Sequence, residues 1–385
     1  MSDFTLYNDD CLNALKSMDE NSIDSCVTDP PYGLSFMGKH WDYDVPSADI
    51  WREVLRVLKP GGHLLAFFGS RTYHRGVIQI EDSGFEIRDQ IMWLYGSGFP
   101  KSHNIGDGWG TALKPAHEPI VVARKPIEEK TIAENVLKHG TGAINIDESR
   151  VDYVSDYDKK HQEDIARGQD NAKNGKFFGG KGKTKASSHT PTGRWPANVI
   201  HDGSDEVVKE FPETKSGIAI QRNGGGQKIG GNGIYGGSKG LTREDVGYDD
   251  SSSVARFFYC AKASKSDRDE GLEQFLAKKI VTFQTGGGAS GNASSLSANR
   301  NTEYKNIHPT VKPTDLMKYL VKLTTPKNGV ILDPFMGSGT TGKACGFEGF
   351  KFVGIVRDPE YFEIAKARIE HAYDNKTVNL EQFFI

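Results

Sequence analysis

Four consecutive residues near the N-terminus could bind an amino group. They are Asp29, Pro30, Pro31 and Tyr32, and they follow a predicted buried strand at residues 22–28. Because prolines cannot continue the strand and stiffen the loop, the Asp29 carboxylate can accept hydrogen bonds from an exocyclic amine while the Tyr32 ring stacks on a planar base. The alternative for this tetrapeptide alone is a turn that Asp29 caps and in which Tyr32 packs.

A second segment, residues 333–342, could hold a nucleotide-like ligand. It predicts a strand end, a glycine turn and then a helix. Glycines let the backbone approach a ligand closely, and a helix N-terminus offers free N–H groups. The candidate cofactor-binding residues are Asp333, Phe335, Gly337, Ser338, Gly339 and Thr340. The same residues fit the G-x-G-x-x-G dinucleotide pattern, which alone is weak evidence, and a plain packing turn is the other alternative.

Both segments lie where strand and helix patterns alternate. Strands are predicted at 22–28, 63–68, 85–95, 118–124, 330–333 and 351–356, and helices at 49–58, 73–83, 314–323, 340–348 and 359–372. This alternation predicts an α/β fold with a doubly wound, mainly parallel sheet. Ligand sites in such sheets lie at the carboxyl ends of the strands.

The α/β pattern is interrupted by a long polar insert. We expect residues 1–126 and 303–385 to be two halves of one core and residues 127–302 to be the insert, with flexible glycine-rich tracts at 223–240 and 286–288. Between residues 159 and 194, nine lysines and arginines stand against three acids. Residues 179–184 are not a phosphate-binding loop, because Phe177 replaces the required leading glycine.

Composition narrows the classes of protein. The 385 residues carry a net charge of −3, so contact with a polyanion must come from a local basic surface. The four cysteines are scattered and predict neither a metal site nor a disulfide framework, which suits a reducing cytoplasm. We find no leader sequence and no apolar run long enough for a membrane helix.

Together, the tetrapeptide at 29–32 and the turn at 333–341 resemble the amino-methyltransferases of DNA. These are enzymes of restriction–modification systems and their solitary or phage-borne relatives. A catalytic motif that precedes the cofactor motif, with a long insert between them, is similar to the beta arrangement of that family. The resemblance covers most of residues 4–126 and 303–385, and within the insert only short stretches such as 193–202 and 257–262.

The resemblance implies direct transfer of a methyl group from S-adenosylmethionine to a flipped base in duplex DNA. Asp29 and the Pro30 carbonyl would bind the target amine, and Tyr32 would stack on the base. Asp before Pro-Pro-Tyr favours adenine N6, and cytosine N4 is the alternative. Methylation at cytosine C5 is not expected. Enzymes of that type have a Pro-Cys nucleophile motif, and no cysteine in this chain follows a proline.

The resemblance also implies a set of cofactor contacts. Asp29 and the turn at 333–340 would line the pocket, Lys312 would belong to a segment, 306–313, that closes over the methionine end of the cofactor, and Asp10 would lie beside its adenine ring. A cap or turn role is the alternative for Asp10 and Lys312. Metal ligands are not expected.

One position departs from the family pattern. Val356 stands where the family usually has a carboxylate for the ribose hydroxyls. Losing both hydrogen bonds would cost about 1–3 kcal/mol, a weakening of about ten- to hundredfold. Asp358, two residues further along an extended segment, could substitute, although a cap on the helix opened by Pro359 is the preferred alternative.

The insert is the expected target-recognition region. Its candidate DNA-binding residues are Lys181, Lys183, Lys185, Arg194 and Trp195, which could neutralise phosphates and stack on bases. A solvated charge run is the alternative. Duplex DNA is the expected partner, with a cognate restriction endonuclease or none, and the protein is expected to be a monomer or a homodimer. Competing hypotheses are a DNA-binding protein with a degenerate cofactor pocket, and methylation of RNA or protein glutamine, which the large basic insert disfavours.

Overall fold

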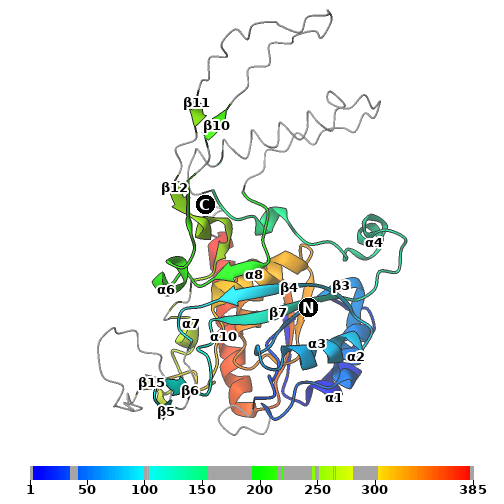
Figure 1. Ribbon diagram of the computed structural model, residues 1–385. Coiled ribbons are helices and arrows are strands. Elements are labelled where there is room, and N and C mark those ends of the chain that lie inside the picture. The colour runs from blue at the N-terminus through cyan, green and yellow to red at the C-terminus, as the bar shows by residue number, and fades with distance from the viewer. Residues whose placement is uncertain are drawn as a thin grey trace, which may run out of the picture.

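A nine-stranded sheet forms the centre of the molecule in the computed structural model (Figure 1). The structure describes residues 3–34, 42–98, 102, 104–153, 159, 193–215, 218–220, 245–247, 251–262, 264, 266–280 and 302–381. The strand order is β1-β17-β16-β2-β3-β7-β4-β8-β13. Neighbouring strands are parallel except where β7 pairs with β3 and with β4. The predicted α/β class with a mainly parallel sheet is confirmed.

The elements have the following bounds. The strands of the sheet are β1 (Phe4–Tyr7), β2 (Ile23–Thr28), β3 (Leu58–Phe67), β4 (Glu86–Leu94), β7 (His117–Arg124), β8 (Val199–His201), β13 (Tyr259–Cys260), β16 (Val330–Asp333) and β17 (Lys351–Ile355). The helices are α1 (Cys11–Lys16), α2 (Ala48–Val57), α3 (Tyr73–Glu81), α4 (Ile132–His139), α6 (Asp205–Val208), α7 (Ser266–Asp269), α8 (Thr314–Thr324), α9 (Thr340–Glu348) and α10 (Pro359–Glu381). Short strands outside the sheet are β5 (Asn104–Gly106), β6 (Trp109–Gly110), β9 (Glu213–Lys215), β10 (Ile218–Ile220), β11 (Asp245–Gly247), β12 (Ser251–Ser253), β14 (Lys278–Ile280) and β15 (Thr302–Tyr304).

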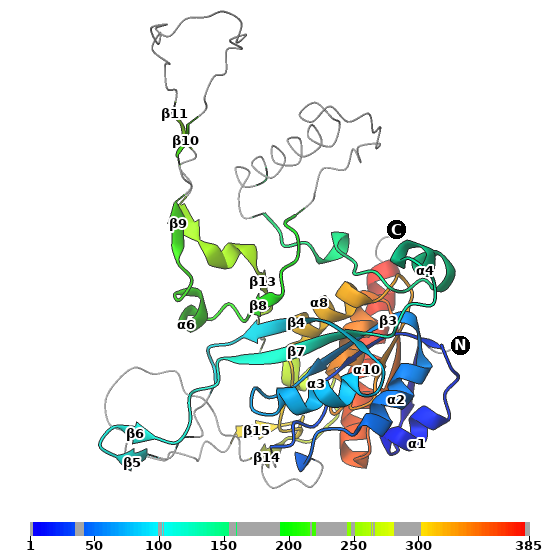
Figure 2. The ribbon, with the colours of Figure 1, turned by 45° about the vertical axis from the view of Figure 1, so that its right-hand side comes forward.

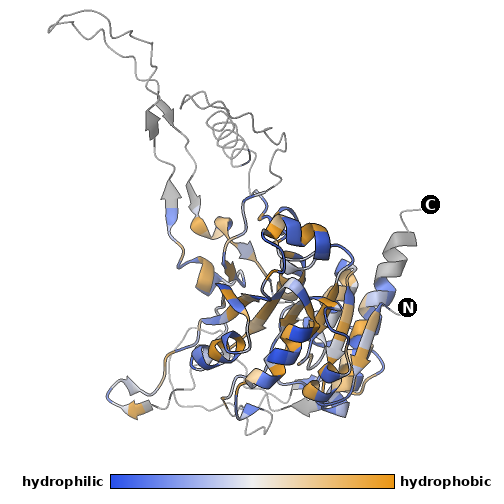
Figure 3. Cartoon of the chain, turned by 90° about the vertical axis from the view of Figure 1, so that its right-hand side faces the viewer, coloured by the Kyte–Doolittle hydropathy of each residue, from blue (hydrophilic) through white to orange (hydrophobic). Residues whose placement is uncertain are grey.

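Each face of the sheet buries its own apolar cluster. Alternate residues of a strand point to opposite faces, so Leu65 and Phe67 of β3 pack with α8, α9 and α10, whereas Leu64 and Ala66 pack with α1, α2 and α3. Figure 2 shows these two helix groups on opposite sides of the sheet, and Figure 3 shows apolar residues concentrated along its strands. This three-layer arrangement covers both faces of the sheet.

The two halves of the core meet at the centre of the sheet. Strand β16 pairs in parallel with β2, placing Ile331 opposite Ser25 and Leu332 opposite Cys26. The Ser25 and Thr325 hydroxyls are 2.7 Å apart in the same buried region. The N-terminal and C-terminal segments therefore form one sheet, and the carboxyl ends of β2 and β16 lie side by side.

The insert is continuous with this core. Strands β8 and β13 extend the sheet beyond β4, and the Ala261 N–H donates to the His201 carbonyl at 2.8 Å. The tracts at 223–240 and 286–288 lie outside the described residues.

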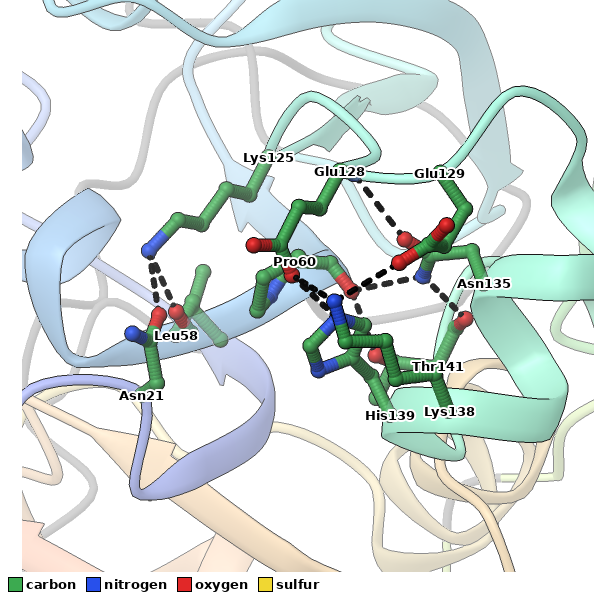
Figure 4. A network of polar contacts seen from close by, with 10 residues as sticks. All are labelled: Asn21, Leu58, Pro60, Lys125, Glu128, Glu129, Asn135, Lys138, His139 and Thr141. Carbon is green, nitrogen blue, oxygen red and sulfur yellow. Dashed lines mark hydrogen bonds and ion pairs between the residues drawn. The ribbon is translucent and has the colours of Figure 1, made fainter.

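Helix α4 was not predicted, and it packs on the start of β3. A capping box joins Thr131 and Glu134 at its N-terminus, and Gly140 ends it with a φ of 78°. Asn135 donates to the Pro60 and Thr141 carbonyls, each at 2.8 Å (Figure 4). The segment just after residue 126 is thus tied to the first half of the core.

Near the same helix, three side chains have potential metal-ligand atoms within 4.8 Å of one another, the only such group among the described residues. They are Glu128, Glu129 and His139. The Lys138 ammonium lies 3.0 Å from Glu128 and 2.7 Å from Glu129, so both carboxylates already pair with a cation of the protein (Figure 4).

Two predicted boundaries differ from the structure. Strand β3 begins at Leu58, whereas residues 59–62 were predicted to form a turn before a strand at 63–68. Pairing with β2 continues through a register shift between Ile23 and Ser25, and such an irregularity tolerates Pro60 in a strand. Helix α10 extends to Glu381, beyond the predicted end at 372. In the described parts of the chain, no helix combines the length and apolar character that crossing a bilayer requires.

Candidate active site at the carboxyl ends of β2 and β16

The two motifs lie together, as the fold prediction required. The loop at 29–32 leaves β2, and the glycine turn leaves β16, its parallel neighbour. The Thr28 hydroxyl donates to Asp333 Oδ1 at 2.6 Å, which joins the two strand ends directly. Residues 305 positions apart in the chain are therefore in contact beneath one site.

Asp333 shapes the glycine turn from beneath. Its side chain is buried, and Oδ1 also accepts from the Phe335 N–H at 3.1 Å while Oδ2 accepts from the Thr341 hydroxyl at 2.6 Å. Burial raises the pKa of Asp333 to about 6, although these hydrogen bonds oppose the shift. Both oxygens are thus used within the protein.

The turn itself requires its glycines. Gly337 and Gly339 have φ angles of 49° and 79°, which favour glycine. A Cβ at Gly339 would lie 3.0 Å from Ala365 of α10, and one at Gly337 would lie 2.9 Å from His308 Nε2. The turn leads into α9 at Thr340, and the first N–H groups of a helix have no intrahelical partners.

The other turn side chains make contacts within the protein. Arg368 donates to the Ser338 hydroxyl at 3.1 Å and to the Thr340 hydroxyl at 3.4 Å, and both side chains are buried. The Phe335 ring contacts Trp51 of α2 edge to face, with centroids 6.2 Å apart. The turn therefore offers its backbone, rather than these side chains, to a bound molecule.

Four polar side chains form a compact cluster above β2. The Tyr32 hydroxyl donates to Asp29 Oδ1 at 2.7 Å, and Lys312 Nζ donates to Asp29 Oδ2 at 2.8 Å. Glu118, the second residue of β7, lies 3.1 Å from Lys312 Nζ and 3.2 Å from the Tyr32 hydroxyl. Lys312 is 10% exposed, so it is a nearly buried cation between two carboxylates.

The electrostatics of this cluster fix its protonation. Burial alone lowers the pKa of Lys312, but the Asp29 and Glu118 carboxylates outweigh it and raise that pKa above its ordinary value. Burial and the same carboxylates raise the pKa of Tyr32. At neutral pH the site therefore holds an ammonium and a neutral phenol. The ammonium also lies over the Tyr32 and Phe67 rings, 5.4 and 4.9 Å from their centroids.

Sequence reasoning missed two residues of this site. Glu118 was seen only as the start of a strand, and nothing in the sequence showed that β7 runs antiparallel and begins beside the carboxyl ends of the parallel strands. Asp42 anchors the loop backbone, because Oδ1 accepts from the Tyr32 and Gly33 N–H groups at 2.7 and 3.0 Å. No motif marked Asp42, which lies ten residues beyond Tyr32.

Asp10 and Asp358 occupy the ends of the neighbouring strands β1 and β17. Asp10 caps α1 by accepting from the Leu12 N–H at 3.0 Å. Asp358 Oδ1 caps α10 by accepting from the N–H groups of Glu360 and Tyr361 at 2.9 and 3.2 Å. The structure shows the capping alternative for both, and their contact with a cofactor stays a prediction.

Val356 packs half-buried against the apolar cluster of the sheet. Its N–H donates to the Tyr7 carbonyl at 3.0 Å, and the Asn8 amide donates to the Val356 carbonyl at 2.9 Å. The backbone of Val356 therefore holds the strand end, and the Val356 side chain offers no acceptor to a ligand.

The structure describes only some of the predicted DNA-binding residues. Lys181, Lys183 and Lys185 lie outside the described residues. Arg194 is only 6% exposed; its guanidinium donates to the Arg256 carbonyl at 2.8 Å and stacks 4.7 Å from the Phe257 ring. In this structure Arg194 holds the insert together and is nearly buried, and its role as a phosphate contact stays a prediction.

Other parts of the surface are better placed for a large partner. Trp195 is 66% exposed, and the Arg150 guanidinium lies 5.7 Å from its ring centroid. The hairpin β5–β6 connects β4 to β7 and projects from the sheet (Figure 2). Exposed apolar side chains mark this connection: Ile105, Trp109 and Leu113 are 69%, 71% and 92% exposed. Because the hairpin precedes Glu118, its base lies near the cluster formed by Asp29, Tyr32, Glu118 and Lys312.

Known proteins are similar to this chain over part of their length. Over 200 residues the chain is 28% identical to the Type II methyltransferase M.HindIII of Haemophilus influenzae, covering 36% of this chain and 64% of that protein. Over 62 residues it is 47% identical to the Type II methyltransferase M2.LlaDCHI of Lactococcus lactis subsp. cremoris, covering 16% and 23%. The matched part is thus less than two thirds of either relative.

Solved structures are similar at low sequence identity. The M1.HpyAVI–SAM complex matches with a TM-score of 0.40 and 16% identity, over 95% of this chain and 99% of that one. The PvuII DNA methyltransferase (cytosine-N4-specific) matches with a TM-score of 0.48 and 14% identity, over 98% and 93%.

The family model for DNA methylases, which describes N6/N4 methyltransferases, matches residues 23–367. That range contains the cluster around Asp29, the glycine turn and the insert between them. Since it covers most of the chain, this protein belongs to the DNA methylase family.

Proposed function

We propose that the protein is a site-specific DNA methyltransferase that moves a methyl group from S-adenosylmethionine to the exocyclic amine of a flipped base. The observation that carries this proposal is the Thr28–Asp333 hydrogen bond of 2.6 Å, because it joins the amine-binding loop to the glycine turn. Donor and acceptor sites then share one edge of the sheet, where effective transfer requires them.

The residues of the loop would bind and orient the base. Asp29 and the Pro30 carbonyl accept hydrogen bonds from the amine, Pro31 keeps the loop rigid, and the Tyr32 ring stacks on the base. In the present structure Asp29 already accepts from Lys312 and Tyr32. An entering amine therefore replaces these donors, and Glu118 keeps the Lys312 ammonium paired as it does so.

The glycine turn fits the proposed cofactor. Positive φ angles at Gly337 and Gly339 make a tight turn with no room for side chains, and the backbone N–H groups at the start of α9 directly beyond it would bind the cofactor. S-adenosylmethionine would supply an electrophilic methyl group bound to a sulfonium. The amine nitrogen would accept this methyl group with its lone pair as the sulfonium leaves with the S–C bonding electrons, and Asp29 would pass the surplus proton to solvent.

Adenine N6 is the proposed target, with cytosine N4 as the alternative. The support is the resemblance of Asp29 before Pro-Pro-Tyr to adenine enzymes. DNA from cells expressing the wild type and Asp29→Ala should be hydrolysed and its nucleosides analysed by mass spectrometry. N6-methyladenine present only with the wild type is expected; N4-methylcytosine would establish the alternative, and no methylated base would contradict the proposal.

Duplex DNA is the proposed partner, and the insert with hairpin β5–β6 is its proposed binding surface. Trp195 with Arg150, and Trp109 on the hairpin, offer exposed aromatic rings and charge for stacking and phosphate contact. Lys181, Lys183 and Lys185 remain proposed phosphate contacts. A cognate endonuclease and the choice between monomer and homodimer stay predictions, as does a cytoplasmic location.

Val356 favours a second candidate, a DNA-binding protein with a degenerate cofactor pocket. Isothermal titration of S-adenosylmethionine into the wild type and Val356→Glu separates the two. A methyltransferase weakened at this position should bind measurably, and the glutamate should tighten binding about tenfold by restoring acceptors for the ribose. Equal affinity of the two proteins would contradict the proposed role of Val356, and binding by neither would support the degenerate pocket.

A further inference from the structure

We propose that residues 267–271 of the insert form a brace that sets the affinity for S-adenosylmethionine, with Arg268 and Arg368 as positioning residues. Residues 267–271 are called the insert brace. The inference rests on the proposed function in that it takes the glycine turn and the segment 306–312 as the two walls of the cofactor site. It adds that the insert holds both walls in place.

The first wall is held by Arg268. Its guanidinium donates to the Asn306 and His308 carbonyls, each at 2.9 Å. Asp269 Oδ1 accepts from the Asn306 N–H at 3.0 Å, and the Asn306 amide donates back to the Arg268 carbonyl at 3.1 Å. The Tyr304 ring lies 4.8 Å from the guanidinium. The insert brace thus makes the hydrogen bonds that a helix or sheet would otherwise give this irregular segment.

This wall reaches both halves of the site. The His308 ring lies so close to Gly337 that a Cβ there would be 2.9 Å from Nε2, and it contacts Tyr361 edge to face at 4.6 Å. Four residues further on, Lys312 pairs with Asp29. The segment therefore meets the cofactor turn at His308, while its far end at Lys312 is held separately by the ion pair with Asp29.

The second wall is held by Arg368 of α10, which is fully buried. One guanidinium nitrogen donates to the Ser338 carbonyl at 2.5 Å, and the other donates to the Asp267 carbonyl at 2.6 Å. Arg368 thus links the cofactor turn to the insert brace. Planar guanidinium groups suit this task, because they present several donors in a fixed geometry.

Two more contacts seat the brace against the core. The Glu270 carboxylate pairs at 2.5 Å with Lys343 of α9, whose side chain is fully buried. Gly271 has a φ of 84°, and a Cβ there would lie 2.9 Å from His371 and 3.1 Å from the Arg368 Cα. The brace therefore contacts α9, α10 and the segment at 306–308 at once. A preorganised pocket binds its ligand more tightly because less ordering is needed on binding.

The test compares Arg268→Ala and Arg268→Lys with the wild type and with Arg56→Lys. Arg56 is a matched control, because it donates to the Met18 and Leu15 carbonyls far from the site. Titration should show Arg268→Ala binding S-adenosylmethionine about tenfold more weakly, with Arg268→Lys intermediate. The KM for S-adenosylmethionine should rise equally, while kcat at saturation and the KM for DNA stay within twofold. Arg56→Lys should lower only the melting temperature.

Three other outcomes would overturn the proposed role of the insert brace. Folded Arg268→Ala with unchanged affinity overturns the brace and leaves the proposed function intact. If Arg268→Ala gives no cooperative melting transition, Arg368→Lys must show the same selective loss of affinity, and a normal affinity there overturns the proposal. Wild-type protein that binds no S-adenosylmethionine overturns the cofactor site and the brace together.

Discussion

At the scale of single residues, Lys312 connects the parts of the site. Its ammonium is held by Asp29 at 2.8 Å and by Glu118 at 3.1 Å, so one carboxylate can release it while the other keeps it paired. A buried ion that loses its partner is strongly destabilised. Glu118 therefore makes it possible for Asp29 to exchange Lys312 for a substrate amine.

Glu118→Gln tests this exchange. Without the Glu118 charge, Lys312 depends on Asp29 alone and competes with the amine for that carboxylate. We expect kcat/KM for DNA to fall about tenfold, measured by transfer of tritiated methyl groups. Glu86→Gln is the control, because Glu86 pairs with Arg124 away from the site. Wild-type kinetics for Glu118→Gln would contradict this role.

Asp333 should make stability depend on pH. Its folded pKa of about 6 exceeds the unfolded value near 3.8, so its favourable contribution is present at low pH and is lost as pH rises toward 6. Relative to Asp333→Asn, the wild type should lose about 2 kcal/mol of unfolding free energy between pH 4 and pH 7. Urea unfolding of both proteins across this range measures the difference. A constant difference would show that the Asp333 pKa is the same in both states.

At the scale of elements, the antiparallel direction of β7 determines which residues lie near the site. Strand β7 runs antiparallel to β3, so its first residues and the preceding hairpin β5–β6 come to the edge formed by the carboxyl ends of the parallel strands. That edge would otherwise receive only the ends of parallel strands. The hairpin is thus joined to Glu118 and to the base site through a short stretch of chain.

Trp109→Ala tests the hairpin as a DNA contact. The ring is 71% exposed, so its loss should not disturb the core. We expect the Kd for a 30-base-pair duplex to rise about tenfold in fluorescence anisotropy, since stacking of a base on an aromatic ring contributes about 1–3 kcal/mol. Affinity for S-adenosylmethionine should not change. Leu137→Ala, at an 87% exposed position on α4, should match the wild type; an equal loss there would point to nonspecific effects.

At the scale of the whole molecule, the insert takes part in the core rather than standing apart from it. It adds β8 and β13 to the sheet and holds both walls of the proposed cofactor site through residues 267–271. The insert and the cofactor turn are therefore in physical contact, and if binding at one changes the affinity of the other, the reverse effect must be equally large.

This connection predicts coupled binding. A 30-base-pair duplex containing the methylated sequence should lower the Kd for S-adenosylmethionine about fivefold in isothermal titration, and the cofactor should tighten DNA binding by the same factor. Arg268→Ala should reduce this factor toward one. Identical cofactor affinities with and without DNA in the wild type would contradict the coupling.

The sequence by itself determined the residue types and the local elements. Two prolines end β2 at Asp29, and glycines with positive φ form the turn after β16, because these are local properties of the backbone. The apolar periodicity of the helices and strands likewise gave the α/β class. The terminal parts of α10 and β3 were misjudged, because pairing and packing extend elements beyond their local signals.

Only the tertiary structure decided which distant side chains meet. The pairing of β16 with β2 brings Asp333 to Thr28, and the antiparallel course of β7 brings Glu118 to Lys312. It also buried Arg194, which the sequence suggested as a DNA-binding residue. Strand order and direction come from burying two faces of one sheet across the whole chain, and no short stretch of sequence contains that information.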